Sequence, residues 1–129
     1  MRPLKRRSKS AASESTGPVS APHVDARYFD VVLPAGAPFE EDVPAGHAAM
    51  LVVYEGGLTV AQTTEVEALS VAVLGDGARI VARAKEKPAR FLLIAGKPIG
   101  EPIAWGGPFV MNTRAELMQA YADYQSGEF

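Results

Sequence analysis

Short apolar runs, each closed by a glycine or proline turn, constrain the fold of this chain more than any other feature of its sequence. β-Branched and aromatic residues dominate these runs, which favours strands over helices. The longest run, residues 48–54, has seven residues, far short of the roughly 20 that a membrane-spanning helix needs. The predicted strands are residues 28–33, 39–43, 48–54, 58–61, 69–74, 78–84 and 90–95.

The turns between these runs predict how neighbouring strands connect. Glu55-Gly56-Gly57 and Gly75-Asp76-Gly77 each separate two apolar runs, and such glycine turns are typical of tight hairpins. Strands do not alternate with helices over the 30-residue units that a parallel sheet requires. Short strands at close spacing therefore predict an antiparallel sandwich or barrel over about residues 27–112.

The end of the chain changes to a helical pattern. Thr113 and Glu116 have the spacing of a capping box, in which each side chain binds the backbone N–H of the other residue. An apolar stripe follows at the spacing of one helix face and comprises Leu117, Tyr121 and Tyr124. We predict a helix over about residues 114–125 and expect this stripe to pack on the barrel.

The first 22 residues differ from the rest in composition. They contain almost no large apolar side chains, so they cannot bury enough surface to offset the entropy of ordering. We therefore predict a disordered arm over residues 1–22. Residues 1–9 carry five basic side chains and no acid, whereas the remaining 120 residues carry eight basic and fifteen acidic ones. Because nucleic-acid binding depends on clustered Lys and Arg, only this arm is expected to support it.

The sequence also excludes several classes of site. There is no cysteine, so disulfides and thiolate metal sites are ruled out. His23 and His47 are the only histidines, which excludes a three-histidine centre within one chain. No apolar signal segment precedes the strands. We expect a cytoplasmic protein, or a nuclear one if the source is eukaryotic.

Several motifs together resemble the C-terminal domain of the pirin family, over roughly residues 17–129. Upstream, YFDVVLPAG at 28–36 and PAGHAAMLVVYEGG at 44–57 resemble the first strands of that domain. The C-terminal motifs are GKPIGEP at 96–102, WGGPFVMNT at 105–113 and YQSGEF at 124–129. The resemblance implies an all-β fold: a single cupin-type, jelly-roll antiparallel β-barrel over residues 23–129 with a C-terminal helix.

The resemblance also implies what this chain lacks. Pirins are two-barrel proteins whose N-terminal cupin holds an iron through His-x-His and His-x-Glu elements, and this chain has neither element. It is similar only to the cupin that has lost these ligands. The quercetin dioxygenase activity of the family is therefore not carried over to any residue here.

The candidate site residues support the same interpretation. His47 and Glu55 bracket one predicted strand, where cupins place metal ligands, but one histidine and one carboxylate hold a transition metal only weakly. We predict no metal, no cofactor and no catalytic residue. We expect His47 to cap a turn or to bind a neighbouring backbone group, and Glu55 and Glu101 to be solvated.

An interface is predicted around Trp105, Phe109 and Val110. These apolar residues lie in a segment rich in glycine and proline, and in a two-barrel protein the second barrel would cover them. The partner is expected to be a second copy or a separate metal-bearing cupin of the pirin N-terminal type. The leading functional hypothesis is a non-catalytic structural or interaction module. The alternatives are an iron dioxygenase acting on flavonol-like substrates when paired with such a cupin, and a small-molecule-binding barrel.

Overall fold

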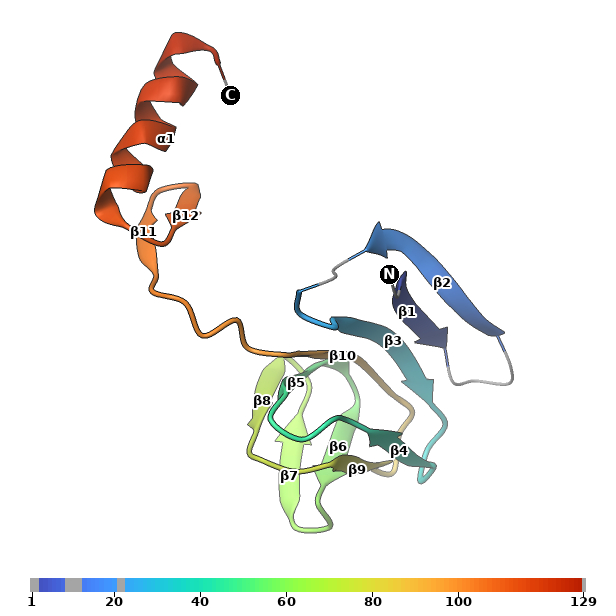
Figure 1. The fold of residues 1–129 in the computed structure, drawn as a ribbon. Coiled ribbons are helices and arrows are strands. Elements are labelled where there is room, and N and C mark those ends of the chain that lie inside the picture. The colour runs from blue at the N-terminus through green and yellow to red at the C-terminus, as the bar shows by residue number, and fades with distance from the viewer. Residues whose placement is uncertain (1–2, 9–12, 21–22, 129) are drawn as a thin grey trace. The chain divides into compact units, whose positions relative to one another are not determined.

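Two β-sheets enclose one apolar core in the part of the chain that precedes Pro98. The structure is a computed structural model and describes residues 3–8, 13–20 and 23–128. Their strands (Figure 1) are β1 (Pro3–Ser8), β2 (Ser13–Ser20), β3 (Arg27–Leu33), β4 (Pro38–Asp42), β5 (Ala48–Glu55), β6 (Gly57–Val60), β7 (Thr64–Glu67), β8 (Ser70–Leu74), β9 (Arg79–Ala84) and β10 (Ala89–Gly96). A second compact unit, Ile99–Phe129, holds β11 (Ala104–Gly106), β12 (Phe109–Met111) and helix α1 (Arg114–Ser126).

The first unit is built from a six-stranded and a four-stranded sheet. The strand order is β2-β1-β3-β10-β5-β8 in the first sheet and β4-β9-β6-β7 in the second. Neighbouring strands run antiparallel except β1 and β3, which are parallel at Lys5 and Arg27. The predicted all-β antiparallel architecture is therefore confirmed.

Buried and exposed side chains alternate along the strands, and this alternation explains how the core forms. β3, β4, β5, β9 and β10 each bury every second side chain, as expected when one face of each sheet is covered. Phe39 of one sheet meets Phe91 of the other edge to face, with ring centroids 5.2 Å apart. The largest fully buried side chains are Phe29, Phe91, Leu51, Leu58, Leu93, Val31 and Val53.

The two predicted glycine hairpins are wrong. The turn at Gly56 joins β5 of the six-stranded sheet to β6 of the four-stranded sheet, and the turn around Asp76 likewise joins β8 to β9. Both connections cross from one sheet to the other. The joined strands therefore lie on opposite sides of the core, and each directs its apolar face toward it. Gly56 is required at its corner, since it has φ of +72° and an added Cβ would lie 2.2 Å from the Pro88 carbonyl oxygen.

A true hairpin forms where the sequence signals none. β6 and β7 pair antiparallel around Ala61 and Gln62, which have φ of +49° and +65°. Two consecutive positive φ values suit the right-handed twist of the flanking strands. Neither residue is glycine or asparagine, so the usual sequence signal for this turn is missing and strand β7 was not predicted.

Two strands lie within residues 1–22, the segment whose composition predicts a disordered arm. β1 and β2 pair antiparallel with each other, and β1 extends the six-stranded sheet beyond β3. Strand pairing at a sheet edge uses backbone groups, so it does not need the apolar side chains on which the prediction was based. Residues 1–2, 9–12 and 21–22 lie outside the described part of the chain.

The second unit confirms the predicted helix and corrects its surroundings. The Thr113 hydroxyl accepts from the Glu116 backbone N–H, the Glu116 carboxylate accepts from the Thr113 N–H, and Gly127 closes the helix in the left-handed conformation. The predicted barrel extends to about residue 112, but β11 and β12 form a hairpin of their own. The Leu117–Tyr121 face of α1 approaches the glycines of that hairpin, since a Cβ on Gly106 would lie 3.0 Å from Leu117.

Candidate functional site

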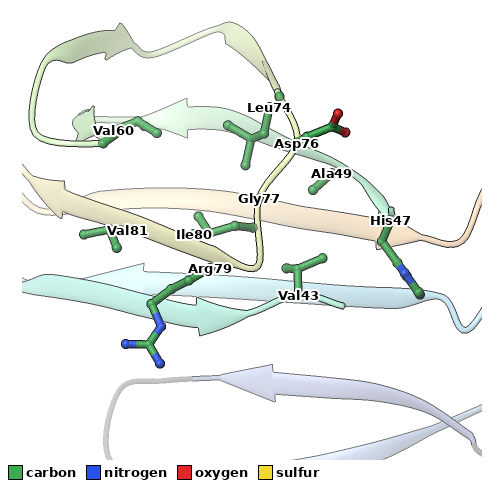
Figure 2. A pocket seen from close by; sticks show the side chains of 12 residues that line it. Val43, His47, Ala49, Val60, Leu74, Asp76, Gly77, Arg79, Ile80 and Val81 are labelled. Carbon is green, nitrogen blue, oxygen red and sulfur yellow. The ribbon is translucent and has the colours of Figure 1, made fainter. Parts of the chain in front are cut away.

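A small pocket opens at the end of the first unit where β4 ends and β5 and β9 begin. Its volume is about 210 Å³, below the 300–1,000 Å³ or so of typical small-molecule sites. Val43, Ala49, Leu74 and Ile80 line it, and Figure 2 shows the Arg79 guanidinium pointing away from it. This pocket is therefore suited to a small ligand only.

His47 lies at the rim of this pocket. Only 9% of its side chain is exposed, and Nε2 lies 3.5 Å from the Asp25 carboxylate. Neither ring nitrogen has a hydrogen-bond partner among the described residues. His47 was expected to cap a turn or to bind a neighbouring backbone group, and its backbone N–H donates to the Pro44 carbonyl at 3.1 Å.

Glu41 is the one buried charged residue in the described part of the chain. It faces inward from β4, and its carboxylate lies 3.5 Å from the Arg27 guanidinium on β3. Arg27 also donates to the Asp42 carbonyl. A carboxylate at this depth needs such a partner, because an unpaired buried charge is strongly destabilising. Glu41 was not singled out in the sequence, since an inward acid cannot be distinguished there from an outward one.

Glu55 lies at the opposite end of β5 from His47. The eight-residue offset along an extended strand separates them by about 26 Å, so the two predicted metal candidates cannot share an ion. Glu55 is exposed, with its carboxylate 3.9 Å from Arg90. Glu101 is also exposed and accepts a hydrogen bond from Asn112 at 2.8 Å. Both carboxylates are solvated, as expected.

The residues present do not fit an iron centre of the kind expected in the other cupin of the pirin family. Such a centre needs at least two histidines and a carboxylate directed at one point. Among residues 3–8, 13–20 and 23–128, no three side chains of the types His, Cys, Asp and Glu come together in a suitable group. The barrel interior, where metal-bearing cupins place their ligands, is filled here by apolar side chains.

A polar cluster on the outer surface of the six-stranded sheet was not predicted. The Tyr54 hydroxyl donates to the Asp30 carboxylate at 2.6 Å, and the Arg90 guanidinium lies 5.3 Å from the centre of the Tyr54 ring. The hydrogen bond to Asp30, followed by desolvation, raises the pKa of Tyr54 above its ordinary value. Only the strand pairing brings these three residues together.

The predicted interface residues separate onto two faces of the β11–β12 hairpin. Trp105 and Val110 are directly paired across the hairpin and are 76% and 62% exposed. Phe109 is only 8% exposed, and its ring packs edge to face on Tyr121 at 5.1 Å. Strand alternation explains the split, since neighbours in a strand point to opposite faces. Trp105 and Val110 therefore form an exposed pair, the hairpin surface, whereas Phe109 belongs to the core of the second unit.

A family model of the pirin C-terminal cupin domain matches residues 28–129. The chain belongs to the pirin family. A pirin-like protein of Caulobacter vibrioides is 53% identical over 122 residues, which cover 93% of this chain and 44% of that protein. A pirin-like protein of Solanum lycopersicum is 41% identical, with 78% of this chain and 36% of that protein covered. The chain thus spans less than half the length of these pirin relatives.

A solved structure together with the family match supports the cupin fold. The crystal structure of a quercetin 2,3-dioxygenase from Acinetobacter baumannii superimposes with a TM-score of 0.81 at 36% identity, over 89% of this chain and 40% of that one. The match therefore extends beyond a shared fold to clear sequence relatedness. No helix among the described residues has the length and apolar character needed to cross a bilayer.

Proposed function

We propose that this pirin-family chain is a non-catalytic structural and interaction module, which binds a metal-bearing cupin through the hairpin surface of Trp105 and Val110. The exposure of these two residues carries the proposal. A tryptophan and a β-branched residue side by side in water are typical of a binding surface, because large aromatic side chains dominate the energy of protein interfaces. The indole N–H donates to the Gly107 carbonyl at 2.9 Å, which holds the ring in one orientation.

The packing of the barrel supports the non-catalytic part of the proposal. Phe29, Leu51 and Phe91 fill the space between the sheets and are at most 2% exposed. A packed apolar interior stabilises the fold but supplies no polar groups for chemistry. Glu41, the one buried charged residue among those that the structure describes, is close to Arg27, a pairing that serves stability.

The relatives support the choice of partner. More than half of the C. vibrioides protein lies outside the match, since the match covers 44% of its length. That remainder exceeds the roughly 100 residues of an ordinary domain, so it is large enough to supply a second cupin barrel. A second copy of this chain is the alternative partner for the hairpin surface.

Binding to the unmatched part of the C. vibrioides relative, produced as a separate protein, tests the proposal. We expect a one-to-one complex by light scattering, and we expect Trp105→Ala to weaken it by at least about tenfold, as for an interface hot spot. Met118→Ala is the matched control, because Met118 is similarly exposed on α1. No complex, or a complex indifferent to Trp105→Ala, would contradict the proposal. A homodimer that Trp105→Ala dissociates would identify the second copy as the partner.

The alternative function is dioxygenase activity, which the solved A. baumannii relative has in its name. Elemental analysis of the purified chain separates the two functions. We expect no stoichiometric iron, manganese or nickel. Stoichiometric metal that is lost in a His47→Ala variant would favour the enzyme. Turnover of a flavonol by the complex with the metal-bearing cupin, unchanged by His47→Ala, would assign the chemistry to the partner.

A further inference from the structure

One free sheet edge lacks the protection that the other edges of the first unit have. β2, β8, β4 and β7 are the end strands of the two sheets. β2 carries Glu14 and Pro18, β4 begins with Pro38 and ends in acids, and β7 has two glutamates. β8 has the sequence Ser-Val-Ala-Val-Leu, with no charge and no proline. Charges, prolines and bulges are the usual devices that keep sheet edges from pairing.

The exposed side chains of β8 are apolar. Val71 and Val73 are 57% and 79% exposed, whereas Ala72 and Leu74 pack toward the core. Val73 is paired with Met50 of β5, and Met50 with Ile94 of β10. The two valines therefore extend an apolar row that crosses the outer face of the six-stranded sheet and ends at this open edge. β8 pairs with β5 without a register shift, so the edge is regular and can accept another strand.

We propose that β8 pairs antiparallel with β8 of a second copy, around a twofold axis at Ala72. The strand is complementary to itself in this register, because Val71 of one copy then faces Val73 of the other. The flanking acids do not face each other across the pair, because Glu67 lies opposite Gly77 and Asp76 lies opposite Ala68. Pairing of β4 or β7 with its own copy would instead crowd acids from both chains onto one short ladder, and like charges across strands are destabilising.

The same argument favours a closed dimer over an open assembly. Each copy has one such edge in the described part of the chain. A twofold pairing leaves no unpaired edge of this kind, so no assembly larger than a dimer forms through it. A five-residue ladder buries far less than the 1,200–2,000 Å² or so of a standard stable interface. We therefore expect a weak dimer, whose population rises with protein concentration. This inference is independent of the hairpin surface and of the proposed function.

Analytical ultracentrifugation of the full chain over a wide concentration range is the first test. We expect a monomer–dimer equilibrium in the unmodified chain and its loss in V71K/V73K, where lysines would face lysines. I99K/I103K is the matched control, because Ile99 and Ile103 are 62% and 79% exposed but lie in the second unit. We expect the control to dimerise like the unmodified chain.

A charge-swapped variant tests the register. In V71K/V73E, the lysine introduced at position 71 of one copy faces the glutamate introduced at position 73 of the other. We expect this variant to form the dimer, with a larger dimer fraction at low salt than at high salt. Amide hydrogen exchange provides a readout without substitution, since protection of residues 70–74 should increase with concentration.

Three results would overturn the inference. They are a monomer at every concentration up to millimolar, a dimer that persists in V71K/V73K, and β8 amides whose exchange does not depend on concentration. A dimer that Trp105→Ala dissociates and V71K/V73K leaves intact would assign self-association to the hairpin surface instead. Thermal unfolding of each variant shows whether a lost dimer reflects a lost fold.

Discussion

The two units of the chain handle their apolar residues in opposite ways. The first unit buries apolar side chains from both sheets in one continuous core. The described part of the second unit buries only Phe109 and Ala120. Its exposed large apolar residues are Ile99, Ile103, Trp105, Val110, Met118 and Tyr124.

The contrast shows what each unit needs in order to fold. Below about 40 residues a chain rarely buries enough surface to be stable alone, and the second unit is shorter than this. Two local interactions help to stabilise it. One is the capping box of α1. The other is the close approach of Tyr121 to Gly107, where an added Cβ would lie 2.7 Å from the Tyr121 hydroxyl. We expect the second unit to be less stable than the first.

Truncation of the central core should have the largest effect. Phe91→Ala removes a ring that is fully buried between the sheets, and such losses cost about 3–5 kcal/mol. In chemical denaturation, we expect the first unit of this variant to unfold cooperatively at a much lower denaturant concentration than in the unmodified chain. Leu69→Ala is the control, because Leu69 is largely exposed and its loss should cost no more than about 0.5 kcal/mol. Equal costs for the two variants would contradict the described core.

Truncation in the second unit should have a smaller and local effect. Phe109→Ala removes the ring that packs on Tyr121 and Tyr124, so we expect α1 to lose its anchor. Helix content by circular dichroism should fall while the unfolding midpoint of the first unit stays unchanged. Val110→Ala, on the opposite face of the hairpin, should retain the helix. A shift in the unfolding of the first unit would show that the two units are energetically coupled.

Loss of the helix cap should cost less again. Thr113→Ala removes the hydroxyl that binds the Glu116 N–H, which typically costs about 1 kcal/mol of helix stability. Thr113→Ser keeps the hydroxyl and is the control. The measurement is the thermal loss of helix signal, and equal stability of the two variants would contradict a stabilising cap.

The same cap predicts a dependence on acid. Hydrogen bonds from the Thr113 side chain and backbone hold the pKa of Glu116 below its ordinary value. A depressed pKa in the folded state means that the stabilisation is complete above the unfolded pKa and is lost as pH falls through the folded one. We expect Thr113→Ala to raise the pKa of Glu116 toward its ordinary value, measured by NMR titration. No change would show that Thr113 does not control this carboxylate.

The smallest effect is expected at the polar cluster of the first unit. The pKa of Tyr54 is raised first by its hydrogen bond to Asp30, so the neutral phenol is favoured in the folded state. Its stabilisation is complete below the unfolded pKa near 10 and is lost as pH rises through the folded value. Asp30→Ala should lower the pKa of Tyr54 in a tyrosinate absorbance titration. Glu101→Gln, in the second unit, should leave it unchanged.

Local pattern explains how much of the fold was predictable. The seven strands from β3 to β10 that were predicted follow apolar runs, and α1 follows a capping box and an αL glycine, so each is encoded within a few residues. β7, β11 and β12 were missed because β7 (Thr-Glu-Val-Glu) is not an apolar run and because β11 and β12 lie in a segment rich in glycine and proline. The hairpin predictions failed because a glycine turn does not specify which sheet the next strand joins.

The candidate site shows the same division. Trp105 and Val110 are exposed, and their role in an interface stays a prediction. The burial of Phe109 depends on which face of the hairpin α1 covers. The environment of His47 arises from Asp25, which lies 22 residues earlier in the chain and approaches only in the folded barrel.

The sequence by itself determined the strand-rich class, the helix with both of its ends, and the absence of a three-histidine centre. These depend on residue type and on spacings of a few residues, which the chain carries whether or not it is folded. Only the tertiary structure decided the strand order, the inward carboxylate of Glu41 and the unprotected edge of β8. Each of these depends on which distant segments share the core, and that is decided by the burial of apolar surface over the whole first unit.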